Sequence, residues 1–101
     1  MDYLEIEDVY FTREEINELM EDINDKLREE DLNGCLIIGI YMEGKILEMD
    51  IADDYGYEKT IKEKIDMRKA PNFNKLEEKY MDSLTQEIID TYNRENDYER
   101  L

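Results

Sequence analysis

The sequence predicts an α+β fold in which a small antiparallel sheet packs with an N-terminal helix and a long C-terminal helix. Two stretches with helical spacing of apolar residues, 13–31 and about 74–95, enclose the middle of the chain. Between them, residues 35–51 have the pattern of two strands joined by a short turn. Helices that flank a hairpin can bury their apolar faces against one side of its sheet. A chain of 101 residues has the length of one domain, 1–101.

The first helix, 13–31, has a recognisable start and end. Thr12 and Glu15 have the spacing of a capping box, in which each side chain bonds the backbone N–H of the other residue. Asn33 and Gly34 supply the stop, because both residue types tolerate the left-handed conformation that follows a last helical turn. The apolar stripe of this helix consists of Ile16, Leu19, Met20, Ile23 and Leu27.

A hairpin follows. Residues 35–42 are apolar at nearly every position, which predicts a strand covered on both faces or nearly so. Glu43 and Gly44 form the expected two-residue turn. In the second strand, 45–51, successive residues are expected to alternate between the two faces of the sheet. One side of that strand is expected to be buried, with Leu47, Met49 and Ile51, and the other to be wetter and acidic, with Ile46, Glu48 and Asp50.

The segment after the hairpin is less regular. Residues 52–57 form a turn or loop that leaves room for a short third strand. Ile61 and Ile65, four apart among lysines, instead favour a short helix over 58–69. Ala70 ends that helix, because a residue that precedes proline avoids helical geometry.

The C-terminal helix, about 74–95, begins at a cap formed by Asn74 and Glu77. The last six residues are polar and are expected to fray, and residues 1–10 are expected to add a short strand through Leu4 and Ile6. The inward stripe of the helix is Phe73, Leu76, Tyr80, Leu84, Ile88 and Tyr92.

Charge is the sequence feature that bears most on function. The chain has 29 acidic and 13 basic residues and no histidine, which gives a formal net charge of −16; a charge of about 2–8 suffices for solubility. Residues 1–31 contain thirteen acids and three bases, whereas residues 59–79 contain four acids and seven bases. This uneven distribution favours an acidic surface that binds a basic partner. An AT-rich genome explains the acid excess less well, because such a bias should raise the number of lysines too. Adaptation to salt also explains the excess less well, because the chain keeps eight lysines and twelve isoleucines.

Catalytic patterns are sparse, which argues against an enzyme. Without histidine there is no Ser–His or Cys–His pair, Ser83 is the only serine, and no glycine-rich phosphate loop occurs. The pattern of a Ca²⁺ loop fails around Gly56, and Asp50, Asp53 and Asp54 could hold an ion only loosely. We therefore expect no metal, no cofactor and no direct contact with nucleic acid.

Two acidic segments are candidate sites for a protein partner. The first is the outer side of helix 13–31, where carboxylates recur about once per turn, near 5.4 Å apart. Like charges at this spacing destabilise an isolated helix, so a binding role competes here with the alternative of an ordinary solvated face. The carboxylates are Glu14, Glu18, Glu21, Asp22, Asp25 and Glu29.

The second candidate is the loop around Gly56. It places Asp53 and Asp54 beside Tyr55 and Tyr57. Such carboxylates can pair with arginine side chains, and tyrosines can anchor in a partner's pocket. The alternative is a tight turn whose tyrosines fold back onto the core.

In acidity, size and helix–hairpin–helix order over residues 12–95, the chain resembles the small acidic inhibitors that phages and mobile elements use against nucleic-acid enzymes, such as anti-CRISPR and anti-restriction proteins. The resemblance is general, and it assigns no residue roles. It implies a non-enzymatic inhibitor whose acidic surface mimics nucleic acid. Such a surface would block the DNA- or RNA-binding site of a basic host-defence enzyme such as a CRISPR effector nuclease.

Two other functions remain open. The chain also resembles acidic immunity proteins, the antitoxin-type partners that neutralise a nuclease toxin. A structural or regulatory subunit without an inhibitory role is the third alternative. The N-terminus lacks the pattern of a signal peptide, and no apolar run has the length of a membrane span. These features predict a cytoplasmic protein without a membrane partner, located in the host cytoplasm if a phage encodes it.

Overall fold

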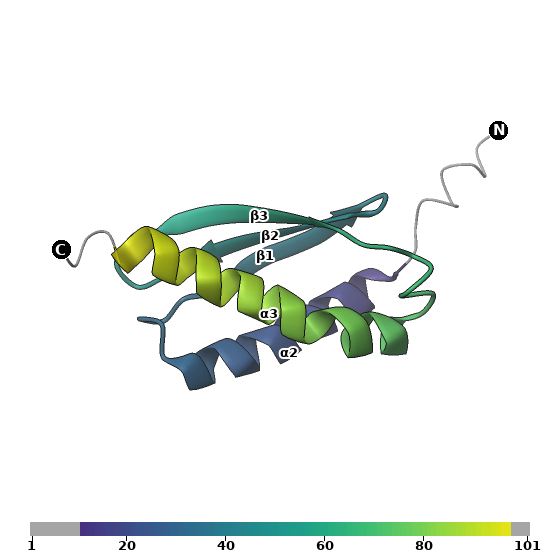
Figure 1. Ribbon diagram of the computed structural model, residues 1–101, viewed down its shortest axis with the longest axis horizontal. Helices are drawn as coiled ribbons and strands as arrows, with labels where there is room; N and C mark the ends of the chain where they lie inside the picture. Colours follow the sequence, from purple (N-terminus) through teal and green to yellow (C-terminus); the bar gives the residue numbers. More distant parts are fainter. Residues whose placement is uncertain (1–10, 98–101) are drawn as a thin grey trace.

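The computed structural model describes residues 11–97, which form two layers (Figure 1). The elements in chain order are α2 (Arg13–Glu30), β1 (Leu36–Glu43), β2 (Ile46–Ala52), β3 (Glu58–Lys64) and α3 (Phe73–Asp97). The strands form one antiparallel sheet in the order β1-β2-β3. Both helices lie side by side on one face of this sheet (Figure 1). The predicted α+β class is confirmed, and the third strand is present. The strand expected through Leu4 and Ile6 lies outside the described residues.

Helix α2 has the predicted start and ends one residue earlier than predicted. Thr12 and Glu15 form the capping box, with reciprocal N···O distances of 2.9 and 3.0 Å. At the other end, Asp31 is already left-handed with a φ of 54°, and Asn33 and Gly34 follow with φ values of 58° and 78°. These three left-handed residues turn the chain from the helix toward the sheet.

A single core lies between the helices and the inward face of the sheet. Its buried members come from every element and include Leu19, Ile23, Leu27, Ile37, Leu47, Met49, Ile51, Ile61, Leu76, Leu84, Ile88 and Tyr92. Cys35 is buried with them as a free thiol. Burial, and secondly the charge of Asp53, raises the pKa of Cys35 to about 11.

The turn of the hairpin is shifted by one residue from the predicted one. Glu43 pairs with Ile46, so the two turn residues are Gly44 and Lys45. Gly44 has a φ of 60°, the left-handed value that the first position of a tight hairpin turn requires. The alternation predicted for β2 is confirmed, because Leu47, Met49 and Ile51 are buried.

The prediction that strand β1 is covered on both faces is wrong, because both helices pack on one face of the sheet and leave the other face open (Figure 1). Ile38 is 64% exposed and Tyr41 is 50% exposed. The register against β2 shifts between Ile37 and Gly39, and this bulge removes Ile38 from the alternation of buried and exposed positions. β-Branched and aromatic residues suit an exposed strand face as well as a buried one, so an apolar run alone does not show that both faces are covered.

Residues 58–64 form β3, which corrects the expectation of a short helix over 58–69. Ile61 and Ile65 are four apart, and an even spacing places two residues on one side of a strand as readily as on one side of a helix. Ile61 pairs with Met49 of β2, and Ile65, directly after the strand, is also buried. Pairing with β2 thus determines the structure of this segment.

Helix α3 begins at a different cap from the predicted one. The side chain of Asn72 accepts the backbone N–H of Lys75 at 2.9 Å and so takes the role expected of Asn74. The helix continues to Asp97, two residues into the stretch predicted to fray. Its inward stripe is fully buried at Leu76, Leu84, Ile88 and Tyr92 and half-buried at Phe73 and Tyr80.

Candidate functional site

Five of the six predicted carboxylates of α2 form an exposed row, which we call the acidic row: Glu14, Glu18, Glu21, Asp25 and Glu29. They lie opposite the buried stripe of the helix because the two sets are half a helical turn apart. At 1.5 Å per residue, the row is about 22 Å long. Among the residues that the structure describes, Asp25 is the only member with an ion pair, to Arg28 at 2.7 Å. The other four carboxylates are therefore available to an external cation.

Asp22, the sixth predicted carboxylate, does not belong to this row. It is half-buried on the side of α2 that faces α3, and its carboxylate oxygen lies within 4.8 Å of oxygens of Glu18 and Glu77. The expectation that Asp22 points to solvent is wrong, because the packing of α3 against α2 covers it.

The close approach of these three carboxylates has an electrostatic consequence. A hydrogen bond with Asp22, then burial and the charges of Asp22 and Glu18, raises the pKa of Glu77 to about 7. Oε2 of Glu77 is buried and has no hydrogen-bond partner among residues 11–97, and a proton on Glu77 gives Asp22 a donor. Three such carboxylates could also hold a hard cation, but below about pH 7 a proton on Glu77 relieves their repulsion instead.

Helix α3 contributes two exposed carboxylates that sequence reasoning did not include. Glu78 and Asp82 lie one turn apart on the helix beside α2. Lys26 of α2 reaches Asp82 at 3.4 Å, while Lys75 and Lys79 pair with Glu78 at 3.2 and 3.7 Å. These carboxylates are more fully neutralised than the acidic row. Their spacing of four was the only available signal, and it is common in a chain so rich in acids.

In the loop after β2, Asp53 is a structural residue. One of its oxygens accepts the backbone N–H groups of Tyr55 and Tyr57, each at 2.9 Å. The other accepts the hydroxyl of Tyr92 from α3 at 2.6 Å. Burial by itself would raise the pKa of Asp53, but the hydrogen bonds from Tyr92 and the backbone outweigh it and hold the pKa below its ordinary value. Asp53 is thus occupied within the fold, so we remove it from the candidate interface.

The two tyrosines of the loop differ in position. Tyr57 is half-buried, packs edge-on against Tyr92 with a centroid distance of 5.2 Å, and donates its hydroxyl to Glu95 at 2.8 Å. Burial, followed by the hydrogen bond to Glu95, raises the pKa of Tyr57 above its ordinary value. Tyr55 is 80% exposed. Only Tyr55 of this pair has the surface to contact a partner directly.

Asp54 is exposed and lies next to the end of α2. Its backbone N–H donates to the carbonyl oxygen of Asn33 at 3.0 Å. This bond joins the loop to the segment that follows the acidic row, and both lie at the same end of the molecule (Figure 1). Asp54 and Tyr55 can therefore extend the surface that ends at Glu29.

The chain matches no protein-family model, and no curated protein or solved structure is significantly similar to it. Within residues 11–97, neither α2 nor α3 combines the length and the apolar composition that crossing a membrane requires. Function must therefore be inferred from the geometry of the surface itself.

Proposed function

We propose that this chain is a non-enzymatic inhibitor whose acidic row occupies the nucleic-acid-binding site of a basic host-defence enzyme, such as a CRISPR effector nuclease. The observation that carries the proposal is the row of exposed carboxylates on α2, four of which have no ion pair within the described part of the chain. A groove that binds nucleic acid presents lysine and arginine to a line of phosphates. A rigid helix with about one carboxylate per turn offers such a groove a comparable line of negative charge.

Rigidity of the row supports this role. The capping box fixes the first turn of α2, and Leu19, Ile23 and Leu27 anchor the opposite side of the helix in the core. The carboxylates are consequently held in line before a partner arrives, so association loses little conformational freedom. Asp54 and Tyr55 extend the same surface beyond Glu29, and Tyr55 offers an aromatic side chain to a pocket. In this proposal the protein acts in the cytoplasm of the cell that contains the enzyme.

A cleavage assay with purified, guide-loaded CRISPR effector nucleases tests the proposal. The wild-type chain should inhibit DNA cleavage by a susceptible effector, and excess target DNA should relieve the inhibition. Glu18→Lys/Glu21→Lys, which reverses two unpaired carboxylates of the row, should weaken inhibition at least tenfold. The control, Glu43→Lys/Glu58→Lys, changes the net charge equally at exposed positions of the sheet and should inhibit as the wild type does.

Other outcomes would separate the alternatives. Equal losses from both variants would show that net charge, rather than the acidic row, is responsible. Inhibition that excess DNA does not relieve would contradict nucleic-acid mimicry. Neutralisation of a nuclease toxin without an effect on effectors would instead identify an immunity or antitoxin-type protein. If the chain inhibits neither the effector nucleases nor a nuclease toxin, the remaining alternative is a structural or regulatory subunit.

A further inference from the structure

The end of the molecule where the β1–β2 turn meets the β3–α3 connection has a charge opposite to that of the chain as a whole. A hollow of about 450 Å³ at this end, which we call the basic pocket, is lined by Lys45, Lys64, Ile65, Asp66, Met67 and Arg68. Three of the lining side chains are cationic and one is acidic, although the net charge of the chain is −16. Among residues 11–97, neither Lys45 nor Lys64 forms an ion pair.

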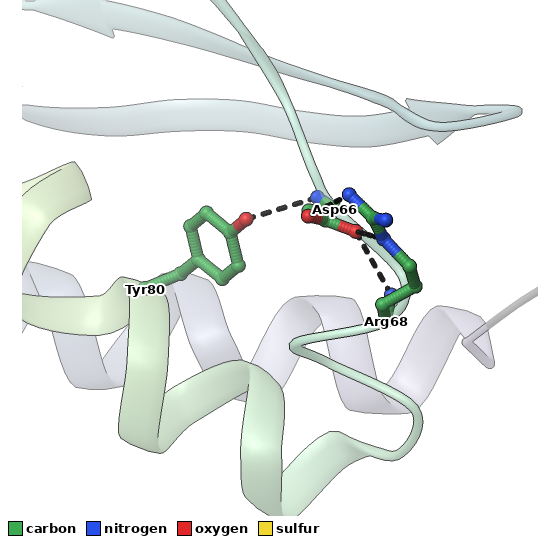
Figure 2. A network of polar contacts seen from close by, with 3 residues as sticks. All are labelled: Asp66, Arg68 and Tyr80. Carbon is green, nitrogen blue, oxygen red and sulfur yellow. Dashed lines mark hydrogen bonds and ion pairs between the residues drawn. The ribbon is translucent and has the colours of Figure 1, made fainter.

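The single acid of the pocket is engaged by a neighbour. Asp66 accepts Nε of Arg68 on Oδ1 and Nη2 of Arg68 on Oδ2, both at 3.1 Å (Figure 2). Oδ1 also accepts the backbone N–H of Arg68 at 3.0 Å. The side chain of Arg68 is nevertheless 91% exposed. A guanidinium has five N–H donors, so Asp66 orients one edge of the group and leaves the outer donors free.

The backbone around the pocket is also held in place. The hydroxyl oxygen of Tyr80 on α3 accepts the N–H of Asp66 at 2.9 Å (Figure 2). The carbonyl oxygen of Asp66 accepts the N–H groups of Lys69 and Ala70 at 2.9 and 3.2 Å. The backbone N–H of Ile65 donates to the backbone carbonyl oxygen of Lys45 at 2.8 Å. The pocket is therefore formed in the free protein, which lowers the entropic cost of binding.

We propose that the basic pocket binds a phosphate group, with Arg68 as a forked donor and Lys45 and Lys64 as neighbouring cations. A guanidinium matches two phosphate oxygens at once, and ammonium groups add compact positive charge. The volume suits a small ligand, either inorganic phosphate or the phosphates of a nucleotide. The net charge of the chain repels anions at long range, but salt screens interactions beyond about 8 Å under physiological conditions. The nearest cations then dominate. The pocket is separate from the acidic row and does not depend on it.

Amide chemical shifts of the full chain, followed during titration, test this proposal. Inorganic phosphate and ADP should each produce saturable shifts around residues 44–46 and 64–69, and chloride at the same ionic strength should not. Equal affinity for the two ligands would identify phosphate itself as the ligand, and tighter binding of ADP would identify a nucleotide. Shifts that rise without saturation, or that spread over all basic residues, would overturn the proposal.

A pair of matched variants locates the site. Lys45→Gln/Lys64→Gln removes two cations whose side chains form no hydrogen bond or ion pair in the described structure, so the fold should persist. It should weaken phosphate binding at least tenfold. Lys75→Gln/Lys79→Gln changes the net charge equally on α3 and should bind phosphate as the wild type does. Unchanged affinity in the Lys45/Lys64 variant, with a native spectrum, would rule out the basic pocket as the site.

Discussion

At the scale of single residues, hydrogen bonds determine which acidic groups are free to meet a partner. The hydroxyl of Tyr92 donates to Asp53 and accepts the side-chain N–H of Asn33 at 3.0 Å. One phenol of α3 therefore joins the loop after β2 to the segment after α2. Both carboxylate oxygens of Asp53 accept hydrogen bonds within the fold, whereas its neighbour Asp54 remains exposed. Adjacent carboxylates of similar sequence context thus have different roles.

Glu77 gives a prediction for the pH dependence of stability. Its pKa is about 7 in the folded protein, against 4.5 as the ordinary value. The folded state therefore binds this proton more tightly than the unfolded state does. The stabilisation is complete below about pH 4.5 and is lost as the pH rises to about 7. We expect Glu77→Gln, which cannot ionise, to be about 1 kcal/mol more stable than the wild type at pH 8 and to lose this advantage at pH 4.

Urea unfolding of both proteins at the two pH values measures the effect. Glu78→Gln is the matched control, because Glu78 lies next in the chain but pairs with Lys75 and Lys79. Hydrogen bonding to Lys75, then its charge, lowers the pKa of Glu78, so this variant should gain no stability at pH 8. A gain in both variants would show that overall repulsion, and not the contact with Asp22, is responsible.

At the scale of elements, local signals predicted the helices and long-range contacts decided the strands. The capping box and the apolar stripe are contained within α2, so its start and its buried side could be predicted. Strand β3 has an even spacing of isoleucines that fits either a helix or a strand, and only β2 resolves the ambiguity. The exposure of Tyr41 in β1 likewise depends on which face of the sheet the helices cover.

The same distinction applies to the candidate interface. The acidic row could be predicted because its positions follow from helical periodicity alone. The burial of Asp22 depends on where α3 packs, and the role of Asp53 depends on Tyr92, 39 residues later. No local pattern contains this information. The predicted exposure of a carboxylate was therefore correct where the helix determines the direction of the side chain and wrong where a distant element covers it.

One side chain of α2 gives a prediction at this scale. Asn24 is buried and bonds both backbone groups of Ile37 in β1, donating to its carbonyl oxygen at 3.0 Å and accepting its N–H at 2.8 Å. These bonds fasten the edge strand beside its bulge to the helix. Asn24→Ala leaves both backbone groups without a partner, so we expect a loss of about 2–4 kcal/mol in the free energy of unfolding.

Chemical unfolding compared with Asn17→Ala tests this role. Asn17 is an exposed residue of the same helix, and its replacement should change stability by no more than about 0.5 kcal/mol. Equal effects of the two substitutions would mean that helix propensity, and not the attachment of β1, explains the result. A selective loss of protection from hydrogen exchange in β1 of the Asn24 variant would further support the attachment.

At the scale of the whole molecule, acidic residues outnumber basic ones in both layers. Helix α2 contains eight acids and three bases, and the three strands together contain five acids and three bases. The molecule measures 54 × 25 × 20 Å. At an ionic strength of about 10 mM the Debye length is roughly 30 Å, so most charges interact across the molecule; at about 100 mM it is roughly 10 Å, and only neighbours interact.

Added salt should consequently affect folding and binding in opposite directions. Between about 10 and 100 mM NaCl, screening relieves the self-repulsion of the net charge of −16, so the melting temperature of the free protein should rise and then level off. Over the same interval, affinity for the basic target of the acidic row should fall, mainly through a slower association rate. Calorimetry of the free protein and association kinetics of the complex measure the two effects. A melting temperature that falls with salt would show that native ion pairs outweigh repulsion. An affinity that stays constant would mean that the acidic row does not bind its target through charge.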